Sequence, residues 1–197
     1  MKPKKVPGIP SQVRGGFQDT ESIKRFSSSE EVDFKFDILK DRFFEINNWN
    51  NYSQGCVSKF ELCDNAGESV SRSPKIGDYI KILLTKINDP EIEDYHWVQI
   101  DMIDKSNPNR IMLQCRPSKL PGNEFAGKTI HFHSAASTST FVISKGNDYI
   151  KMAIYERNQQ PNKNTSFANS IKNIVSSVTG TSKIQWKSLA DGLININ

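Results

Sequence analysis

Apolar residues change their spacing along this chain. From about Val32 to Tyr155 they mostly alternate with polar residues, which is the pattern of strands with one buried face. From Phe167 to Leu193 they recur every three or four residues, which is the pattern of amphipathic helices. The change of period predicts an α+β domain in which a curved, mostly antiparallel sheet is covered by helices from the C-terminal end.

The alternating region divides at turn-forming residues into short strands. Gly, Pro, Asn and Asp punctuate it, and the clearest hairpin loops are 105–109 and 145–148. We expect a sheet of six or seven strands, drawn from Val32–Ile38, Val57–Asp64, Asp78–Lys86, Tyr95–Ile103, Arg110–Arg116, Thr129–Ser134, Thr138–Ser144 and Tyr149–Tyr155.

Helices are predicted at both ends of this sheet. One of roughly ten residues begins near Asp37, where Leu39, Phe43 and Ile46 follow at helical spacing. Two more follow the sheet, because an apolar stripe over Phe167–Val178 ends at Gly180 and Ser182 can cap a second helix. The sequence thus predicts one N-terminal and two C-terminal helices packed on the sheet.

Charge and composition separate the first 29 residues from the rest. Residues 1–29 lack apolar periodicity and are rich in Pro, Gly and Ser, so they are predicted to be a flexible arm, with one domain over residues 30–195. The formal net charge of +4 lies within residues 1–25, and the remainder sums to zero. A neutral domain does not favour nucleic-acid binding, and the basic arm is a possible segment for a protein partner.

The chain offers little that points to a cellular compartment outside the cytoplasm. No apolar run approaches the roughly 20 residues that span a bilayer, and Val6–Pro10 is unsuited to the apolar part of a signal peptide. The cysteines number three and no pair has CxxC spacing. We expect a cytoplasmic protein without a disulfide framework.

His131-Phe132-His133 is the most chemically suggestive motif. Residues two apart on a strand share a face, so both imidazoles could serve a metal, with His96 or Glu124 as a third ligand. The serine-rich stretch 134–140 could supply a nucleophile beside them, but it lacks a GxSxG elbow. No third ligand has a diagnostic spacing, so a His-dependent metal hydrolase is kept as an alternative. The sequence favours a protein that is not an enzyme and holds neither metal nor cofactor.

Bulky aromatic residues favour ligand binding instead. A sheet bent around a helix commonly leaves a cavity, and amphipathic rings line such cavities. The predicted apolar contacts are Trp49, Tyr95, Trp97 and Phe141, and the predicted polar contacts are His131, His133 and Arg157.

Two resemblances extend this interpretation. The order of the strand Val32–Ile38, the turn Asn48–Tyr52 and the helix Ser166–Val178 resembles the START-like helix-grip domains. That resemblance implies a bent sheet wrapped around a long C-terminal helix, enclosing an apolar ligand cavity. Separately, segments 74–79, 138–141 and 182–187 look like parts of an uncharacterised bacterial family, which transfers no activity.

The leading hypothesis is therefore non-catalytic binding of a small or lipid-like molecule between the sheet and the C-terminal helix. The alternatives are an interaction module that uses the basic arm and the His-dependent hydrolase.

Overall fold

The protein is described from a computed structural model, which covers residues 2–53, 58–84, 94–119, 121, 133–160 and 183–196, without the side chains of residues 84, 94 and 95. Its elements in chain order are β1 (Gly16–Arg25), α1 (Ser29–Phe44), η1 (Ile46–Asn48), α2 (Trp49–Tyr52), β2 (Ser58–Cys63), β3 (Tyr79–Leu84), β4 (Asp94–Asn107), β5 (Arg110–Pro117), β6 (Thr138–Lys145) and β7 (Tyr149–Gln159). A C-terminal helix over residues 183–194 completes the described part.

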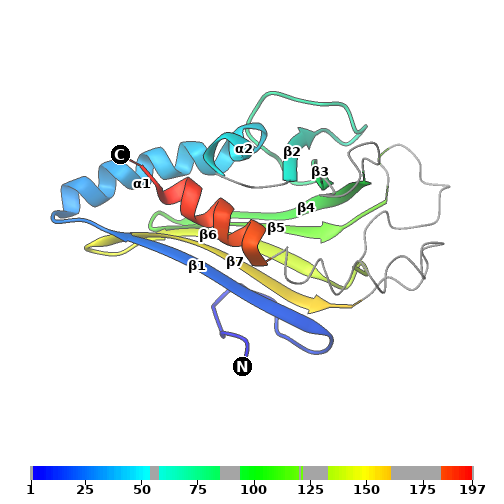
Figure 1. Cartoon of the computed structure of the whole chain (residues 1–197), viewed down its shortest axis with the longest axis horizontal. Helices are drawn as coiled ribbons and strands as arrows, with labels where there is room; N and C mark the ends of the chain where they lie inside the picture. The colour runs from blue at the N-terminus through cyan, green and yellow to red at the C-terminus, as the bar shows by residue number, and fades with distance from the viewer. Residues whose placement is uncertain are drawn as a thin grey trace.

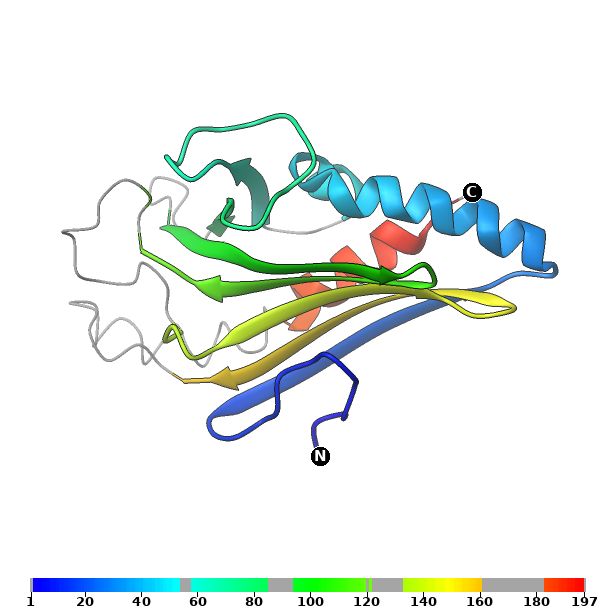
Figure 2. The same cartoon turned by 180° about the vertical axis from the view of Figure 1, so that it is seen from behind.

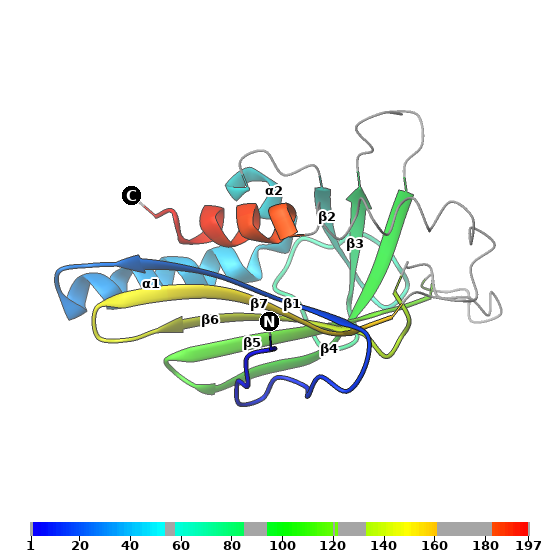
Figure 3. The same ribbon diagram turned by 60° about the horizontal axis from the view of Figure 1, so that its bottom comes forward.

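One antiparallel sheet of seven strands organises the domain, in the order β1-β7-β6-β5-β4-β3-β2. Strands β2 to β7 follow one another as a meander, and β1 joins the far edge beside β7. The sheet curves around the C-terminal helix, as Figure 3 shows. The α+β class and the hairpin turns between β4 and β5 and between β6 and β7 are confirmed.

The helices α1 and 183–194 cover the same face of the sheet, called here the concave face, and the N-terminal residues lie on the opposite, convex face (Figures 1 and 2). One C-terminal helix is present in the described part of the chain, where the sequence predicted two. The other, Phe167–Val178, lies outside the described residues, as does most of the predicted strand Thr129–Ser134.

The predicted strand Val32–Ile38 is wrong, because these residues belong to α1. The helix begins after Ser28, whose hydroxyl caps it by accepting a hydrogen bond from the Glu31 N–H at 3.2 Å. Val32, Phe36, Leu39 and Phe43 are its buried side chains, at a helical spacing that continues past the alternating stretch. Phe34 alternates with them in the sequence but is 63% exposed, so its apolar character misled the strand prediction.

The prediction of a flexible arm over residues 1–29 is wrong for Gly16–Arg25, which form the edge strand β1. This strand pairs with β7 over its whole length. Its buried side chains are only Thr20 and Ser22, both small and polar. A strand with so few apolar residues is invisible to a search for alternating hydrophobicity, because its backbone pairing with β7 stabilises it. The folded domain therefore begins upstream of residue 30.

The main core lies between the concave face and the helices. Trp49, Phe60, Phe141 and Trp186 form its aromatic centre, with Trp49 fully buried and its Nε1 donating to the Phe43 carbonyl at 3.2 Å. A second, smaller apolar cluster on the convex face is made of Met112, Val142, Ala153 and Tyr155.

The C-terminal helix is fixed at its last turn. The backbone of Gly192 approaches α2 so closely that a Cβ at this position would lie 1.8 Å from the carbonyl oxygen of Tyr52. Arg42 of α1 donates to the carbonyls of Gly192, Leu193 and Asn195 at 3.4, 3.3 and 3.2 Å. The last carbonyls of a helix lack partners within it, so a cation is favoured near them, and here the Gly192 carbonyl also accepts from the Asn195 N–H at 3.2 Å. The helix is thus held at a defined height above the sheet.

Candidate functional site

Polar side chains gather on the concave face at the end of the sheet where β7 finishes and β2 starts. Strand register shows which residues share this face. Phe60, Ile82 and His96 are direct partners across β2, β3 and β4, and the first two belong to the main core. Cys115, Ser139 and Glu156 are partners across β5, β6 and β7, and Cys115 belongs to the same core. His96 and Glu156 therefore face the C-terminal helix.

We call the polar residues at this end of the sheet the strand-end cluster. Its members are side chains with hydrogen-bonding capacity: Ser58, His96 and Glu156 on the sheet, Trp186 on the helix above Phe60, and His133, which interacts electrostatically with His96. Ser58, Glu156 and Trp186 are buried, with 2, 5 and 7% of their surface exposed.

An aromatic floor lies beside the cluster. The Trp186 ring is 5.5 Å from Phe141 and 6.1 Å from Phe60, centroid to centroid, and Phe141 is 5.2 Å from Trp49. Such contacts hold the indole of Trp186 in one orientation. The indole N–H of Trp186 is thus a polar group held in a fixed position beside apolar rings.

Two polar atoms of the cluster are buried without a hydrogen-bond partner in the described part of the chain, the Nε1 of Trp186 and the Oγ of Ser58. A buried indole N–H usually finds an acceptor. Leaving a buried donor unsatisfied costs about 1–3 kcal/mol. The cluster therefore contains hydrogen-bonding capacity that the described residues do not use.

His133 is uncharged at neutral pH. Burial lowers its pKa to about 4, the backbone hydrogen bond with Gln160 acts in the opposite direction, and the charge of a protonated His96 lowers the pKa further. A neutral imidazole can both donate and accept a hydrogen bond. At this position it suits a polar group without charge better than an anion.

The structure brings some of the sequence-predicted site residues together and separates others. Trp49 and Phe141 meet in the concave core, next to Trp186. Trp97 alternates with the core residue Val98 and packs on the convex side against Tyr79, with ring centroids 6.3 Å apart. His131 and the side chain of Tyr95 lie outside the described residues.

Arg157 also points to the convex face, where only 1% of its surface is exposed. Its guanidinium contacts the carboxylate of Asp19 and donates to the Lys4 carbonyl at 2.9 Å. Arg157 and Trp97 are therefore on the opposite side of the sheet from Trp49 and Phe141.

Trp186 and Ser58 were absent from the sequence-predicted site. Trp186 keeps helical spacing with Leu189 and Leu193, and its polar N–H was the available signal that it could do more than pack. The sequence around Ser58 gives no indication that this residue is buried, because its burial is decided by the position of the start of β2 in the folded sheet.

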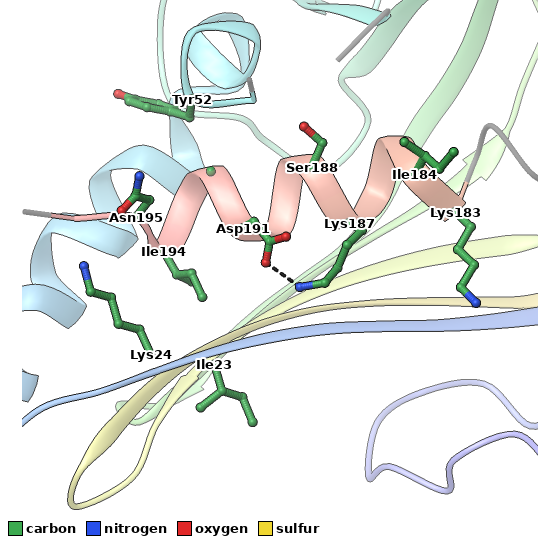
Figure 4. A pocket seen from close by; sticks show the side chains of 11 residues that line it. Ile23, Lys24, Tyr52, Lys183, Ile184, Lys187, Ser188, Asp191, Ile194 and Asn195 are labelled. Carbon is green, nitrogen blue, oxygen red and sulfur yellow. Dashed lines mark hydrogen bonds and ion pairs between the residues drawn. The ribbon is translucent and has the colours of Figure 1, made fainter. Parts of the chain in front are cut away.

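A separate groove of about 740 Å³ runs between β1 and the C-terminal helix (Figure 4). Two of its charged groups bind each other: Lys187 pairs with Asp191 and donates to the Ser22 hydroxyl at 2.8 Å, and Ser22 donates to Asp191 at 2.6 Å. Lys24 donates to the Ile196 carbonyl at 2.7 Å. These contacts join the helix to the edge strand, which accounts for the polar character of the groove.

Within the described ranges, no group of three or more His, Cys, Asp or Glu side chains is placed to hold a metal ion. None of the described helices is long and apolar enough to cross a membrane.

Comparison with solved structures gives the architecture a context. The hypothetical protein jhp0584 from Helicobacter pylori aligns over 98% of this chain and 97% of its own, with a TM-score of 0.57 and 12% identity. The order of the strands and the position of the C-terminal helix against the concave face of the sheet define the fold type. The chain has a helix-grip fold. The resemblance to START-like domains is thus confirmed, and a bacterial protein shares the fold.

Two plant proteins of this architecture are more distant. Norcoclaurine synthase from Thalictrum flavum, in complex with dopamine and hydroxybenzaldehyde, has a TM-score of 0.45 and 10% identity, over 98% of this chain and 99% of its own. The major latex-like protein 151 from Panax ginseng has a TM-score of 0.39 and 12% identity, over 86% and 97%. No protein-family model matches the sequence, and no curated protein matches it.

Proposed function

We propose that this protein binds a small, uncharged amphipathic molecule on the concave face, between the strand-end cluster and the C-terminal helix, without catalysing a reaction. The unpartnered Nε1–H of Trp186 carries the proposal, because a ligand oxygen beside it would remove the cost of burying that donor. The helix-grip architecture supports the same location, since it places a helix against a bent sheet.

The surroundings of Trp186 set the ligand's chemistry. Phe60 and Phe141 supply apolar contact on the floor. The Ser58 hydroxyl and the neutral His133 supply uncharged hydrogen-bonding groups. A molecule with an apolar body and a carbonyl or hydroxyl group fits this combination.

Nile red, an uncharged dye with a carbonyl acceptor, is a suitable probe for the test. The purified protein is first unfolded, extracted with organic solvent and refolded, and the dye is titrated by fluorescence. We expect saturable binding with one dye per chain. The extract, analysed by mass spectrometry, identifies any molecule that co-purifies.

Trp186→Phe keeps an aromatic ring but removes the donor, and Trp97→Phe makes the same change on the convex face. We expect Trp186→Phe to weaken dye binding about tenfold, the value of one hydrogen bond of about 1.4 kcal/mol. Trp97→Phe should leave the affinity unchanged. Absence of saturable binding, or equal losses in the two variants, would contradict the proposed site.

A further inference from the structure

The N-terminal segment, residues 2–15, lies across the convex face of the sheet, opposite the proposed ligand site (Figures 2 and 3). Val6 and Ile9 pack on the apolar cluster of Met112, Val142, Ala153 and Tyr155. Val13, by contrast, is 81% exposed. The segment is therefore attached to the sheet by two apolar side chains near its middle and by polar contacts elsewhere.

Its polar contacts form two groups. Near its start, the Lys4 N–H donates to the Asp19 carboxylate at 2.8 Å and the Lys4 ammonium pairs with Glu21. Near its end, the contacts converge on Asn158, close to the end of β7. The Oδ1 of Asn158 accepts hydrogen bonds from the backbone N–H groups of Val13 and Arg14, at 2.8 and 3.3 Å. The Nδ2 of Asn158 donates to the Ser11 carbonyl at 3.1 Å, and its backbone N–H donates to the Gln12 Oε1 at 2.9 Å. One residue thus holds a four-residue stretch of the segment, through its side chain at residues 11, 13 and 14 and through its backbone N–H at Gln12.

Asn158 also has an unusual backbone. With a φ of 56°, it is the one residue other than glycine with a positive φ among the described residues. It lies in a bulge: between the pairs Gly16–Gln159 and Gln18–Glu156, β7 contains one more residue than β1. A left-handed residue costs roughly 1–2 kcal/mol and persists where its surroundings hold it. The contacts with residues 11–14 are such surroundings.

The stretch of β7 that holds the N-terminal segment also contacts residues close to the proposed ligand site. The Asn158 carbonyl accepts from the Ser137 hydroxyl at 3.0 Å, and the Gln160 N–H donates to that hydroxyl at 3.4 Å. The Gln160 carbonyl accepts from the Ser134 N–H at 2.8 Å. The backbone of Gln160 also forms a hydrogen bond with the imidazole of His133. The N-terminal segment and His133 are thus attached to the same short stretch, 158–160.

We propose that docking of the N-terminal segment controls the ligand site by holding this bulge. When the segment is docked, Asn158 stays left-handed and Gln160 positions His133 at the strand-end cluster. When the segment is released, β7 pairs with β1 without the extra residue. Loss of a bulge moves the following residues by one position, and a one-position move exchanges the faces of a strand. Gln160 then no longer holds His133. The ligand part of this inference rests on the proposed function.

The test releases the segment in the full chain without touching the bulge. The variant Val6→Ser/Ile9→Ser weakens the apolar contact, and Val13→Ser is the control, because this side chain is exposed and its contact with Asn158 is made by the backbone. Limited proteolysis within residues 2–15 reports release. Hydrogen exchange of the Ser134 amide reports the bulge, and exchange of the Ile154 amide, in the middle of β7, reports global unfolding.

We expect the double variant to be cleaved faster, to exchange the Ser134 amide about tenfold faster with Ile154 unchanged, and to bind Nile red several-fold more weakly. The control should match the unmodified protein. If the segment is released while Ser134 exchange stays the same, the proposal is overturned.

A second variant decides the case in which the double variant unfolds or stays docked. Asn158→Gly removes the side-chain contacts with residues 11, 13 and 14, leaves the backbone N–H that binds Gln12, and tolerates a positive φ. It should release residues 11–14 and accelerate Ser134 exchange, and an unchanged Ser134 amide would again overturn the proposal. If Nile red does not bind the unmodified protein, the proposed function fails, while the exchange measurements still decide whether the segment controls the bulge.

Discussion

The contact between Gly192 and α2 allows a sharp prediction about how the C-terminal helix is positioned. Alanine in place of Gly192 has two opposite effects. In a helix, alanine is favoured over glycine by about 0.5–1 kcal/mol. However, its Cβ would lie 1.8 Å from the Tyr52 carbonyl oxygen and 2.5 Å from the carbonyl carbon.

The clash decides the sign. An ordinary contact needs roughly 3.4 Å, so the two backbones would have to separate by about 1.5 Å. Both partners are backbone atoms, and no side-chain rotation relieves the contact. Overpacking of this kind costs about 3 kcal/mol, at the upper end of its usual range. After subtraction of the helix preference, we expect Gly192→Ala to destabilise the protein by about 2 kcal/mol.

Thermal unfolding followed by circular dichroism measures this effect. For a chain of this size, 2 kcal/mol lowers Tm by about 4–8 °C. Ile184→Ala is the control in the same helix, since Ile184 is 71% exposed and surface substitutions usually change stability by less than about 0.5 kcal/mol. A Tm for Gly192→Ala equal to or above that of the unmodified protein would refute the close approach of the helix to α2.

Three further predictions concern single side chains. Arg42→Met removes the donor to three carbonyls at the end of the C-terminal helix; we expect a loss of about 1 kcal/mol in urea unfolding, and an unchanged midpoint would show that this cap contributes nothing. His133 has a pKa of about 4, below that of an unfolded histidine, so the unfolded chain binds the proton more readily. Stability should therefore fall by about 2 kcal/mol from pH 7.5 to pH 5, and His133→Gln should show a smaller fall if the assignment is correct. Burial raises the pKa of Asp78, but hydrogen bonds from Arg72 and the Lys75 N–H outweigh it and lower the pKa overall. The ionised Asp78 therefore stabilises the folded protein above the unfolded pKa, and this stabilisation is lost as the pH falls through the lowered folded pKa. We expect Asp78→Asn to lose less of its free energy of unfolding between pH 6 and pH 3 than the unmodified protein.

The hairpins were predictable because their signals are local. The turn residues in 105–109 and 145–148 favour tight reversals whatever the rest of the chain does, and both hairpins are present. The second C-terminal helix was predictable for a similar reason, since Trp186, Leu189 and Leu193 keep helical spacing and are buried.

Two predicted elements differ from the structure, one because a local helix cap overrides an alternating pattern and one because a long-range partner decides the local structure. Residues 32–38 alternate like a strand, but the helix begins earlier at the Ser28 cap and buries a different set of side chains. Residues 16–25 look like a polar linker, but β7 offers them an unpaired sheet edge. The β7 edge is a long-range partner that the local pattern does not report, whereas the Ser28 cap is a local signal that the alternation of residues 32–38 outweighed.

The candidate site shows the same division between sequence and tertiary structure. By itself the sequence determined an α+β chain with a bent antiparallel sheet, a C-terminal helix and an ample supply of aromatic residues. Which aromatic residue meets which polar group depended on the register and the bulges, because each extra residue in a strand exchanges its two faces. Tertiary structure therefore placed Trp97 and Arg157 on the convex face, and Trp186, Ser58 and His96 on the concave face. It also joined the N-terminal segment to the end of β7, a contact between residues 145 positions apart in the sequence that no local pattern encodes.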